Sequence, residues 1–237
     1  MSWTLVTGGA KNLGATIAIE LARLGYNIVI HYRSSYLEAQ HVVSQCSQYG
    51  VNASMIQGDF SSWESTQEFI QRYKEQFSDT SHLINNVGNY LIASSLNTTV
   101  QQWYDLFQTN LHTPYLLTKA LLPSIKERKG SIINIGVVGL NSWKADTYST
   151  VYTLAKAGLL TLTRSLAREL ASEGVRVNMV SPGHLEKSID LPQDLTKIPM
   201  QRPGKYSEVA DLIAYLLSNK AQYITGQNIE IAGGTRL

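Results

Sequence analysis

The chain has 237 residues, of which 43% are hydrophobic and 16% charged, and its formal net charge is +2. This is the composition of an ordinary globular domain, and a near-neutral chain without a run of Lys or Arg argues against a nucleic-acid-binding surface. The single cysteine, Cys46, excludes an intrachain disulfide and leaves too few ligands for a zinc site, so no metal is expected.

Short β-branched segments alternate along the chain with longer segments of helical periodicity. In chain order, strands are predicted at Trp3–Thr7, Asn27–His31, Ala53–Gln57, His82–Asn85, Ser131–Ile135, Arg176–Val180 and Gln227–Ile231. Helices are predicted between them at Leu13–Leu24, Leu37–Tyr49, Ser65–Phe77, Val100–Lys126 (with a break near Pro114), Val151–Ser172 and Ser207–Leu217.

Repeated strand–helix units with apolar strands predict one α/β domain over residues 1–237. The expected architecture is a doubly wound Rossmann fold, a mostly parallel sheet of seven strands with helices on both faces. Residues 184–206 contain three prolines, mixed charge and no periodicity. Because such loops usually cover a site, we expect this one to contact the substrate.

A glycine-rich turn follows the first predicted strand and opens the first predicted helix. Its sequence is Thr7-Gly-Gly-Ala-Lys-Asn-Leu-Gly14. Glycine allows a tight turn and close approach to a pyrophosphate, which rests on the helix N-terminus. Asn12 stands where glycine is usual, and we expect the turn to form because asparagine tolerates the left-handed conformation. The alternative is a plain turn between a strand and a helix.

The end of the second predicted strand indicates which dinucleotide binds. NAD sites place Asp or Glu there, on the ribose 2′-hydroxyl, but this chain has His31-Tyr-Arg-Ser-Ser35 and no acid before Glu38. Arg33 and Ser34 are suited to a 2′-phosphate, and Lys11 in the glycine turn adds positive charge. NADP(H) is therefore the predicted cofactor, and the alternative is that Arg33 is only a solvated surface residue.

Tyr152 and Lys156 are four residues apart in a predicted helix, so their side chains share one face. A free phenol has a pKa of about 10, and a neighbouring ammonium lowers it toward neutral pH. The pair is a candidate proton donor with its own tuning group. Taken alone, the pattern more often marks a half-buried tyrosine beside a solvated lysine.

Together these motifs resemble the short-chain dehydrogenase/reductase family, and the resemblance covers essentially the whole chain. It rests on the glycine turn, the Tyr-x-x-x-Lys pair and five further motifs. These are Asp59 in GDF, Asn85-Asn-Val-Gly88, Asn110 in NLHTP, Pro182-Gly183 and the C-terminal YITGQNIEIAGG. Several independent motifs in the correct order make a chance match very improbable.

The resemblance implies a role for each matched position. It makes Tyr152 the proton donor to a carbonyl oxygen as hydride reaches the carbon. Lys156 would hydrogen-bond the nicotinamide ribose, and Asn110 would hold a water that links this lysine to solvent. The implied cofactor-binding residues are Gly8, Lys11, Asn12, Leu13, Gly14, Arg33, Ser34, Asp59, Phe60, Asn86, Val87, Gly88, Tyr152, Lys156, Pro182 and Gly183.

One position departs from the family. A serine after the fifth strand usually polarises the substrate carbonyl, but here its place holds Val137 counted from the strand, or Gly139 counted back from Tyr152. Asn141 and Ser142 are the nearest other donors, although both can instead simply shape the loop. Loss of one positioned donor typically costs roughly 3–4 kcal/mol, or 10²–10³ in rate.

Other loop residues have two interpretations each. Ser188 lies close to the usual place of a threonine in the family, and His184 is a candidate acid, although a lone loop histidine is more often structural. Trp143 and Tyr148 are suited to stacking on a flat substrate ring, or they pack within the loop.

The leading hypothesis is an NADPH-dependent reductase of a ketone, ketoacyl or conjugated-ring substrate, similar to 3-oxoacyl-acyl-carrier-protein reductases. A pteridine reductase-like enzyme is the rival within this class. The missing serine also motivates a non-catalytic NADP-binding sensor or partner subunit. The resemblance implies a small-molecule carbonyl substrate and a homo-oligomer, either a dimer or a tetramer.

The expected location is the cytoplasm. The first residues enter a predicted strand without a charged leader, and no apolar run is long enough to span a bilayer. A single cysteine also fits a reducing compartment. We therefore expect no membrane and no nucleic acid among the partners.

Overall fold

A parallel sheet forms the centre of the protein. The computed structural model describes residues 2–142 and 144–236. Within them, seven strands pair in the order β3-β2-β1-β4-β5-β6-β7, and every neighbouring pair is parallel. The strands are β1 (Trp3–Val6), β2 (Asn27–Tyr32), β3 (Ala53–Gln57), β4 (Thr80–Asn85), β5 (Ser131–Ile135), β6 (Arg176–Pro182) and β7 (Asn228–Ile231).

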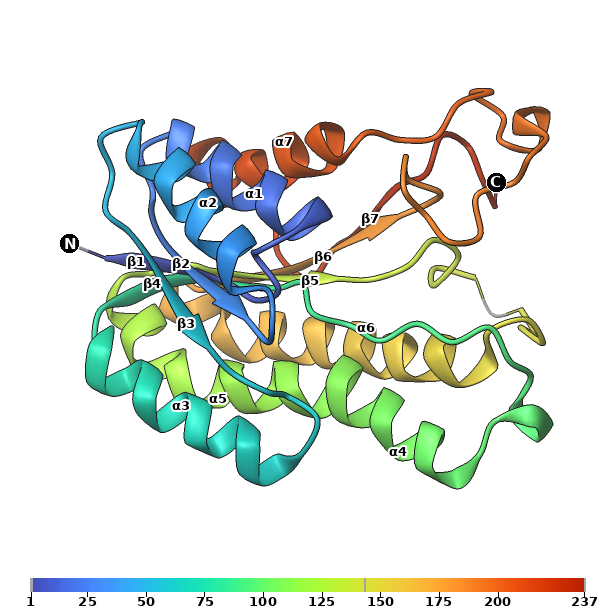
Figure 1. Cartoon of the computed structure of the whole chain (residues 1–237), viewed down its shortest axis with the longest axis horizontal. Helices are drawn as coiled ribbons and strands as arrows, with labels where there is room; N and C mark the ends of the chain where they lie inside the picture. Colours follow the sequence, from blue (N-terminus) through green and yellow to red (C-terminus); the bar gives the residue numbers. More distant parts are fainter. Residues whose placement is uncertain (1, 143, 237) are drawn as a thin grey trace.

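Helices cover both faces of this sheet (Figure 1). One face carries α1 (Asn12–Arg23), α2 (Tyr36–Ser47) and α7 (Tyr206–Leu217). The other carries α3 (Trp63–Gln76), α4 (Val100–Phe107), α5 (Thr113–Glu127) and α6 (Thr150–Leu170). The predicted doubly wound Rossmann fold is therefore confirmed, and most predicted ends differ from those observed by one or two residues, as is usual at element termini.

Alternation along the strands fills the core on both sides of the sheet. Val6 and Ile30 point into the apolar cluster beneath α1 and α7, whereas Leu5 and Val29 point into the cluster beneath α3 and α5. All four side chains are fully buried. Burial of each such side chain is worth roughly 1.5–3 kcal/mol, which explains why these strands read as continuous apolar runs.

The long predicted helix over 100–126 is broken, but not at Pro114. Helix α4 ends at Phe107, a π-helical turn occupies Gln108–His112, and α5 begins at Thr113. The π-turn lies directly before Pro114, which occupies the first turn of α5 and has no N–H to donate to the preceding turn. A π-turn inside helical sequence often marks a functional position, and this one contains Asn110.

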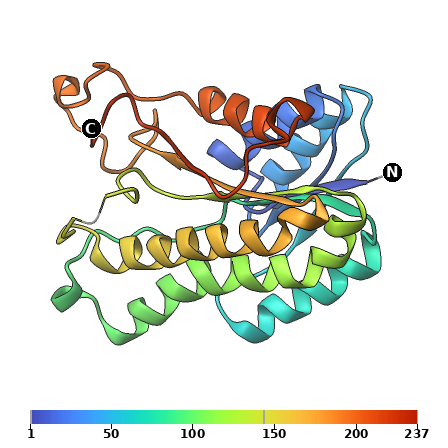
Figure 2. The same cartoon turned by 180° about the vertical axis from the view of Figure 1, so that it is seen from behind.

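The strand order reverses between β1 and β4, because the chain builds β2 and β3 on one side of β1 and then crosses to the other. Loops leaving the carboxyl ends of strands diverge at such a point and leave a crevice for ligands. The loops over 86–99, 136–142 with 144–149, and 183–205 gather at this edge of the sheet, which is on the right in Figure 1 and on the left in Figure 2.

Candidate active site

The glycines of the turn between β1 and α1 stand where a side chain would not fit. Gly8 has a φ of +63° and Asn12 of +49°, so Asn12 adopts the predicted left-handed conformation. A Cβ atom on Gly14 would lie 2.2 Å from the carbonyl oxygen of Gly8 and 2.7 Å from Nδ2 of Asn86. The N-cap residue of α1, Lys11, makes no side-chain capping hydrogen bond, so the first N–H groups of this helix are available to a phosphate.

Thr7 and Asn86 join this turn to the segment that follows β4. The Thr7 hydroxyl donates to the carbonyl oxygen of Ile84 at 3.2 Å and accepts from the backbone N–H groups of Asn86 and Val87 at 2.9 and 3.0 Å. Asn86 Nδ2 donates to the carbonyl oxygens of Thr7 and Gly8 at 2.9 and 3.3 Å. The predicted cofactor positions Gly8, Asn86 and Val87 are thereby held together.

A buried histidine supports the turn. His31, 2% exposed at the end of β2, accepts the N–H of Gly8 at Nδ1 (3.1 Å), and its Nε2 lies 3.2 Å from the carbonyl oxygen of Gly58. The imidazole is therefore neutral with its proton on Nε2, and burial lowers its pKa to about 4. The ring of Phe60 stacks on the imidazole of His31, with the ring centres 4.0 Å apart. Phe60 is therefore buried against His31 and is not open to the surface, whereas its neighbour Asp59 is half-buried.

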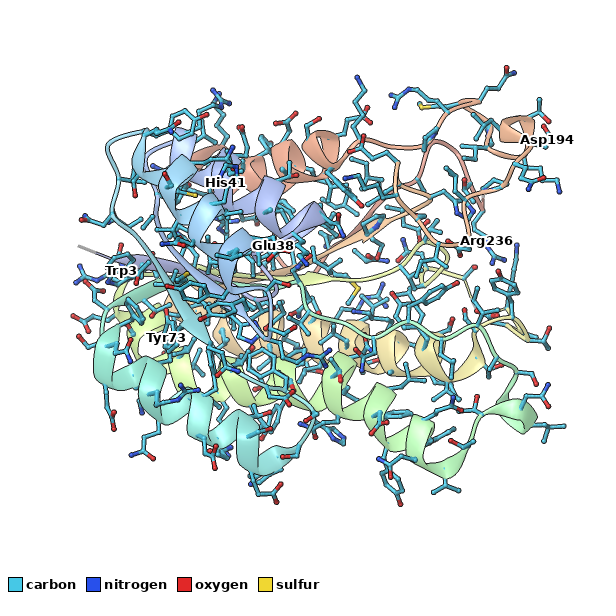
Figure 3. The ribbon with its side chains drawn as sticks, in the orientation of Figure 1. Trp3, Glu38, His41, Tyr73, Asp194 and Arg236 are labelled. Carbon is cyan, nitrogen blue, oxygen red and sulfur yellow. The ribbon has the colours of Figure 1, made fainter. Side chains whose placement is uncertain are left out.

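The residues predicted to bind a 2′-phosphate lie at the surface. Arg33 and Ser34 are exposed after β2, and Lys11 Nζ is 2.7 Å from a carboxylate oxygen of Glu38 on α2, a residue labelled in Figure 3. A phosphate at this position would compete with Glu38 for Lys11, an exchange that solvent-exposed ion pairs allow. Lys11 and Glu38, but not Arg33 or Ser34, line a 530 Å³ surface cleft that Lys187 of the loop after β6 also lines.

Tyr152 and Lys156 lie on one face of α6, as their spacing predicts. Lys156 Nζ donates to the carbonyl oxygen of Ile135 at 2.7 Å and is 5.7 Å from the centre of the Tyr152 ring. Burial lowers the pKa of Lys156 to about 8. Burial and then the charge of Asp190 raise the pKa of Tyr152, opposite to the direction expected from its lysine neighbour. The phenol therefore carries its proton at neutral pH.

Asn110 faces this pair from the π-turn. Its Nδ2 donates to the carbonyl oxygens of Asn89 and Leu106 at 2.9 and 3.0 Å, and its buried Oδ1 has no hydrogen-bond partner among the described residues. A Cβ atom on Gly88 would lie 2.6 Å from this oxygen and 3.3 Å from Lys156 Nζ. The three predicted catalytic residues thus converge around a glycine that leaves space between them. An open acceptor here and a glycine-rich turn before α1 fit a nicotinamide dinucleotide lying across the crevice.

The loop after β5 supplies no hydroxyl at the place of the usual serine. Asn141 pairs with Asn228 on β7, with Nδ2 of Asn228 donating to Oδ1 of Asn141 at 3.1 Å. Ser142 Oγ donates to the carbonyl oxygen of Gly139 at 3.1 Å. The structure therefore favours the loop-shaping interpretation for both residues. Trp143 lies outside the described residues.

The end of β6 lies against the same loop. Val138 donates its N–H to the carbonyl oxygen of Pro182 at 3.1 Å, and the N–H of Gly183 pairs with β7 at 3.0 Å. Ser188 Oγ accepts the N–H of Leu185 at 2.8 Å, so its hydroxyl holds a turn of the loop. Pro182 and Gly183 thus lie at the carboxyl end of β6, and their cofactor contacts stay a prediction, whereas the hydroxyl of Ser188 is used within its own loop.

Sequence reasoning did not single out Tyr90 and Asp190, which lie beside Tyr152. The rings of Tyr90 and Tyr152 meet edge to face with their centres 4.8 Å apart. The Tyr90 hydroxyl donates to Asp190 Oδ2 at 2.8 Å, and His184 Nδ1 is 3.6 Å from Asp190 Oδ1. Both residues are in aperiodic loops, and only their position after carboxyl ends of strands hints at a role.

Asp146 anchors the start of the helix that carries Tyr152. Its carboxylate accepts the backbone N–H groups of Tyr148 and Ser149 at 2.8 and 3.0 Å. It also accepts the hydroxyls of Ser149 and Thr153 at 3.2 and 2.6 Å. These bonds fix the segment over 146–149 against the first turn of α6, the helix that carries Tyr152.

The fold and site define a dinucleotide-binding oxidoreductase, and comparison with known proteins gives its family. The family described as enoyl-(acyl carrier protein) reductase matches residues 8–236. The chain is 36% identical over 242 residues to a 3-oxoacyl-(acyl-carrier-protein) reductase of Staphylococcus aureus, covering 97% of this chain and 96% of that protein. The chain belongs to the short-chain dehydrogenase/reductase family and is an NAD(P)-dependent oxidoreductase.

Solved structures agree with this assignment. An acetoin dehydrogenase from Salmonella typhimurium superposes with a TM-score of 0.90 at 29% identity, covering 98% of this chain and 95% of that one. A short chain dehydrogenase from Burkholderia cenocepacia, in complex with NADP, gives 0.89 at 28% identity, with coverage of 98% and 97%. Within residues 2–142 and 144–236, no helix could cross a membrane and no cluster of three or more His, Cys, Asp or Glu is suited to a metal ion.

Protonation of His31 should weaken the fold as the pH falls from 6.5 to 4. The pKa of His31 is about 4 in the folded protein, against 6.5 for an ordinary histidine, so the unfolded chain binds more protons in this window. From pH 7 to pH 5, the free energy of unfolding of the wild type should therefore fall about 2 kcal/mol more than that of His31→Asn. Urea unfolding at both pH values measures the difference. An equal loss of unfolding free energy in the two proteins would contradict the lowered pKa of His31.

Proposed function

We propose that this protein is an NADPH-dependent reductase of carbonyl compounds. The observation that carries the proposal is the convergence of a protonated Tyr152, the buried Lys156 and the open acceptor of Asn110 at the crevice. When bound, NADPH would supply the hydride that reaches the carbonyl carbon. The residues that would hold it are those of the glycine turn, Asn86-Val-Gly88, Asp59, Arg33 and Pro182-Gly183.

Tyr152 acts as the general acid in this proposal. The phenol would transfer its proton to the carbonyl oxygen as that oxygen gains charge, which gives an alcohol. Lys156, with a pKa of about 8, carries its proton at neutral pH and offsets the negative charge left on the phenolate. Asn110 Oδ1 is placed to accept from a water that returns the proton through this lysine.

The substrate we propose is a ketone, a ketoacyl compound or a conjugated ring. The names of the Staphylococcus aureus and Salmonella typhimurium relatives point to a 3-oxoacyl group and to acetoin. A pteridine reductase-like activity is the alternative within the class. The absence of a hydroxyl at the serine position favours a further candidate, an NADP-binding sensor or partner subunit without turnover.

Replacement of Tyr152 with Phe should remove reduction. Loss of a positioned general acid lowers kcat by about 10²–10⁴-fold, while the Kd of NADPH should stay within about threefold of the wild-type value. The measurement is NADPH oxidation with a β-ketoacyl thioester, a diketone, a quinone and an oxidised pterin. Tyr223→Phe, which alters a fully exposed tyrosine, is the matched control.

Each outcome of this panel has a distinct meaning. Turnover lost in Tyr152→Phe and kept in Tyr223→Phe would support the reductase and name its substrate class. Turnover kept in Tyr152→Phe would contradict the mechanism. Tight NADPH binding without oxidation of any substrate by the wild type would favour the sensor.

The preference for NADPH over NADH should depend on Arg33. A hydrogen bond between ions contributes about 1.5–3 kcal/mol, so Arg33→Ala should raise the Kd of NADPH about 10- to 100-fold and leave that of NADH nearly unchanged. Fluorescence titration measures both affinities, with Arg164→Ala on the exposed face of α6 as a charge-matched control. A parallel loss for both cofactors in Arg33→Ala would argue against a 2′-phosphate contact.

We further propose a homo-oligomer that works in the cytoplasm. Apolar side chains are exposed on the helices of one face, namely Trp103, Tyr104, Tyr115 and Leu154. The thiol of Cys46 is buried and unpaired, which suits a reducing compartment. Light scattering at micromolar concentration should give the mass of a dimer or tetramer, and a monomer would contradict the proposed assembly.

A further inference from the structure

We propose that Asp190 selects the substrate. In this inference its carboxylate binds a hydrogen-bond donor or a positive charge adjacent to the reducible carbonyl and disfavours substrates that carry an anion there. The inference rests on the proposed carbonyl reduction and adds the chemical class of the substrate, an amino- or hydroxy-substituted ketone or an N–H-bearing ring rather than a 2-oxo acid.

The first step is the position of the carboxylate. Asp190 is one residue away from the proton donor, because it accepts the hydroxyl of Tyr90 at 2.8 Å and the Tyr90 ring lies against the Tyr152 ring. Its charge also contributes to the raised pKa of Tyr152. The negative charge of Asp190 therefore lies close to the space beside Tyr152 that the reacting carbonyl must enter.

The second step is the capacity of Asp190 for another partner. A carboxylate offers about four lone-pair sites. Asp190 uses one for Tyr90, and its other oxygen is 3.6 Å from His184 Nδ1. With 23% of its side chain still accessible, the carboxylate keeps acceptor sites that a substrate donor can fill.

The third step is that Asp190 is held in place by its surroundings. The base of its loop is pinned by two backbone hydrogen bonds, Glu186 N–H to Gly204 at 3.0 Å and Gly204 N–H to His184 at 2.9 Å. The Tyr90 hydroxyl then fixes the carboxylate from the opposite side of the crevice. A preorganised acceptor of this kind loses little entropy when a ligand binds.

The fourth step is the contrast with the missing serine. A serine hydroxyl donates to the substrate carbonyl, but the loop after β5 has turned its nearest polar groups, Asn141 and Ser142, to β7 and to Gly139. The site therefore lacks that donor and contains an acceptor, the carboxylate of Asp190. A site with a fixed polar group selects strongly for the complementary group on its substrate, because the unmatched alternative leaves a charge unpaired.

A binding experiment tests the inference without turnover. The probes are benzamidine and benzoate, which share a planar shape and differ in the sign of charge, titrated into the NADPH-saturated protein by calorimetry. The wild type should bind benzamidine about tenfold or more tightly than benzoate, and Asp190→Asn should reduce this preference to about twofold or less. Asp190→Asn preserves the shape of the side chain, and a thermal melt would verify its fold.

Asp194→Asn is the matched control. Asp194 belongs to the same loop but lies at its outer end, where its carboxylate binds Thr196 (Figure 3). This variant should keep the wild-type preference for benzamidine. Equal affinity of the wild type for the two probes, or a preference unchanged in Asp190→Asn, would overturn the inference.

A kinetic experiment separates this inference from the proposed function. The substrates are α-aminoacetophenone and phenylglyoxylate, aryl ketones that carry a positive and a negative group beside the carbonyl. The wild-type ratio of their kcat/KM values should favour the aminoketone, and Asp190→Asn should lower it about 10-fold or more. An unchanged ratio with turnover still dependent on Tyr152 would refute only the role of Asp190. Reduction of neither ketone would count against the proposed function, and the calorimetric comparison would still decide the role of Asp190.

Discussion

The buried hydroxyl of Thr7 is the contact on which the geometry of this site depends. It links the end of β1 to the start of the loop after β4, and it does so where the strand order reverses. Parallel pairing of β1 with both β2 and β4 brings three carboxyl ends to one edge. The glycine turn, the support from His31 and the convergence of Asn110 with α6 all follow from this arrangement, because each needs a backbone placed by the sheet.

The site combines familiar proton-transfer groups with an altered charge environment. In the proposed mechanism, Tyr152 is the proton donor, Lys156 the cation and Asn110 the acceptor for a water. Around them, the hydroxyl donor usual in the family is missing and the carboxylate of Asp190 is present. Burial and this carboxylate both raise the pKa of the phenol, so transfer of its proton depends on the negative charge that develops on the substrate oxygen.

The sheet and the loops at its edge differ in how much sequence change they tolerate, and this difference has a physical basis. The apolar faces of the strands must pack against helices on both sides, so the sheet and its order tolerate little change. Loops at the carboxyl ends are free of that constraint, and the loops over 136–149 and 183–205 hold most departures of this chain from its family. Membership of the family therefore establishes the fold and the class of chemistry, whereas the substrate depends on residues such as Tyr90 and Asp190.

The sequence by itself determined the kind and order of the helices and strands, because hydrophobic periodicity is local. It also determined the left-handed Asn12 and the shared face of Tyr152 and Lys156, since both depend on neighbouring residues alone. Only the tertiary structure decided the π-turn at Asn110, the raised pKa of Tyr152 and the pairing of Tyr90 with Asp190. Tyr90 and Asp190 are 100 residues apart, and their contact depends on how two aperiodic loops close over one edge of the sheet, which local preferences do not encode.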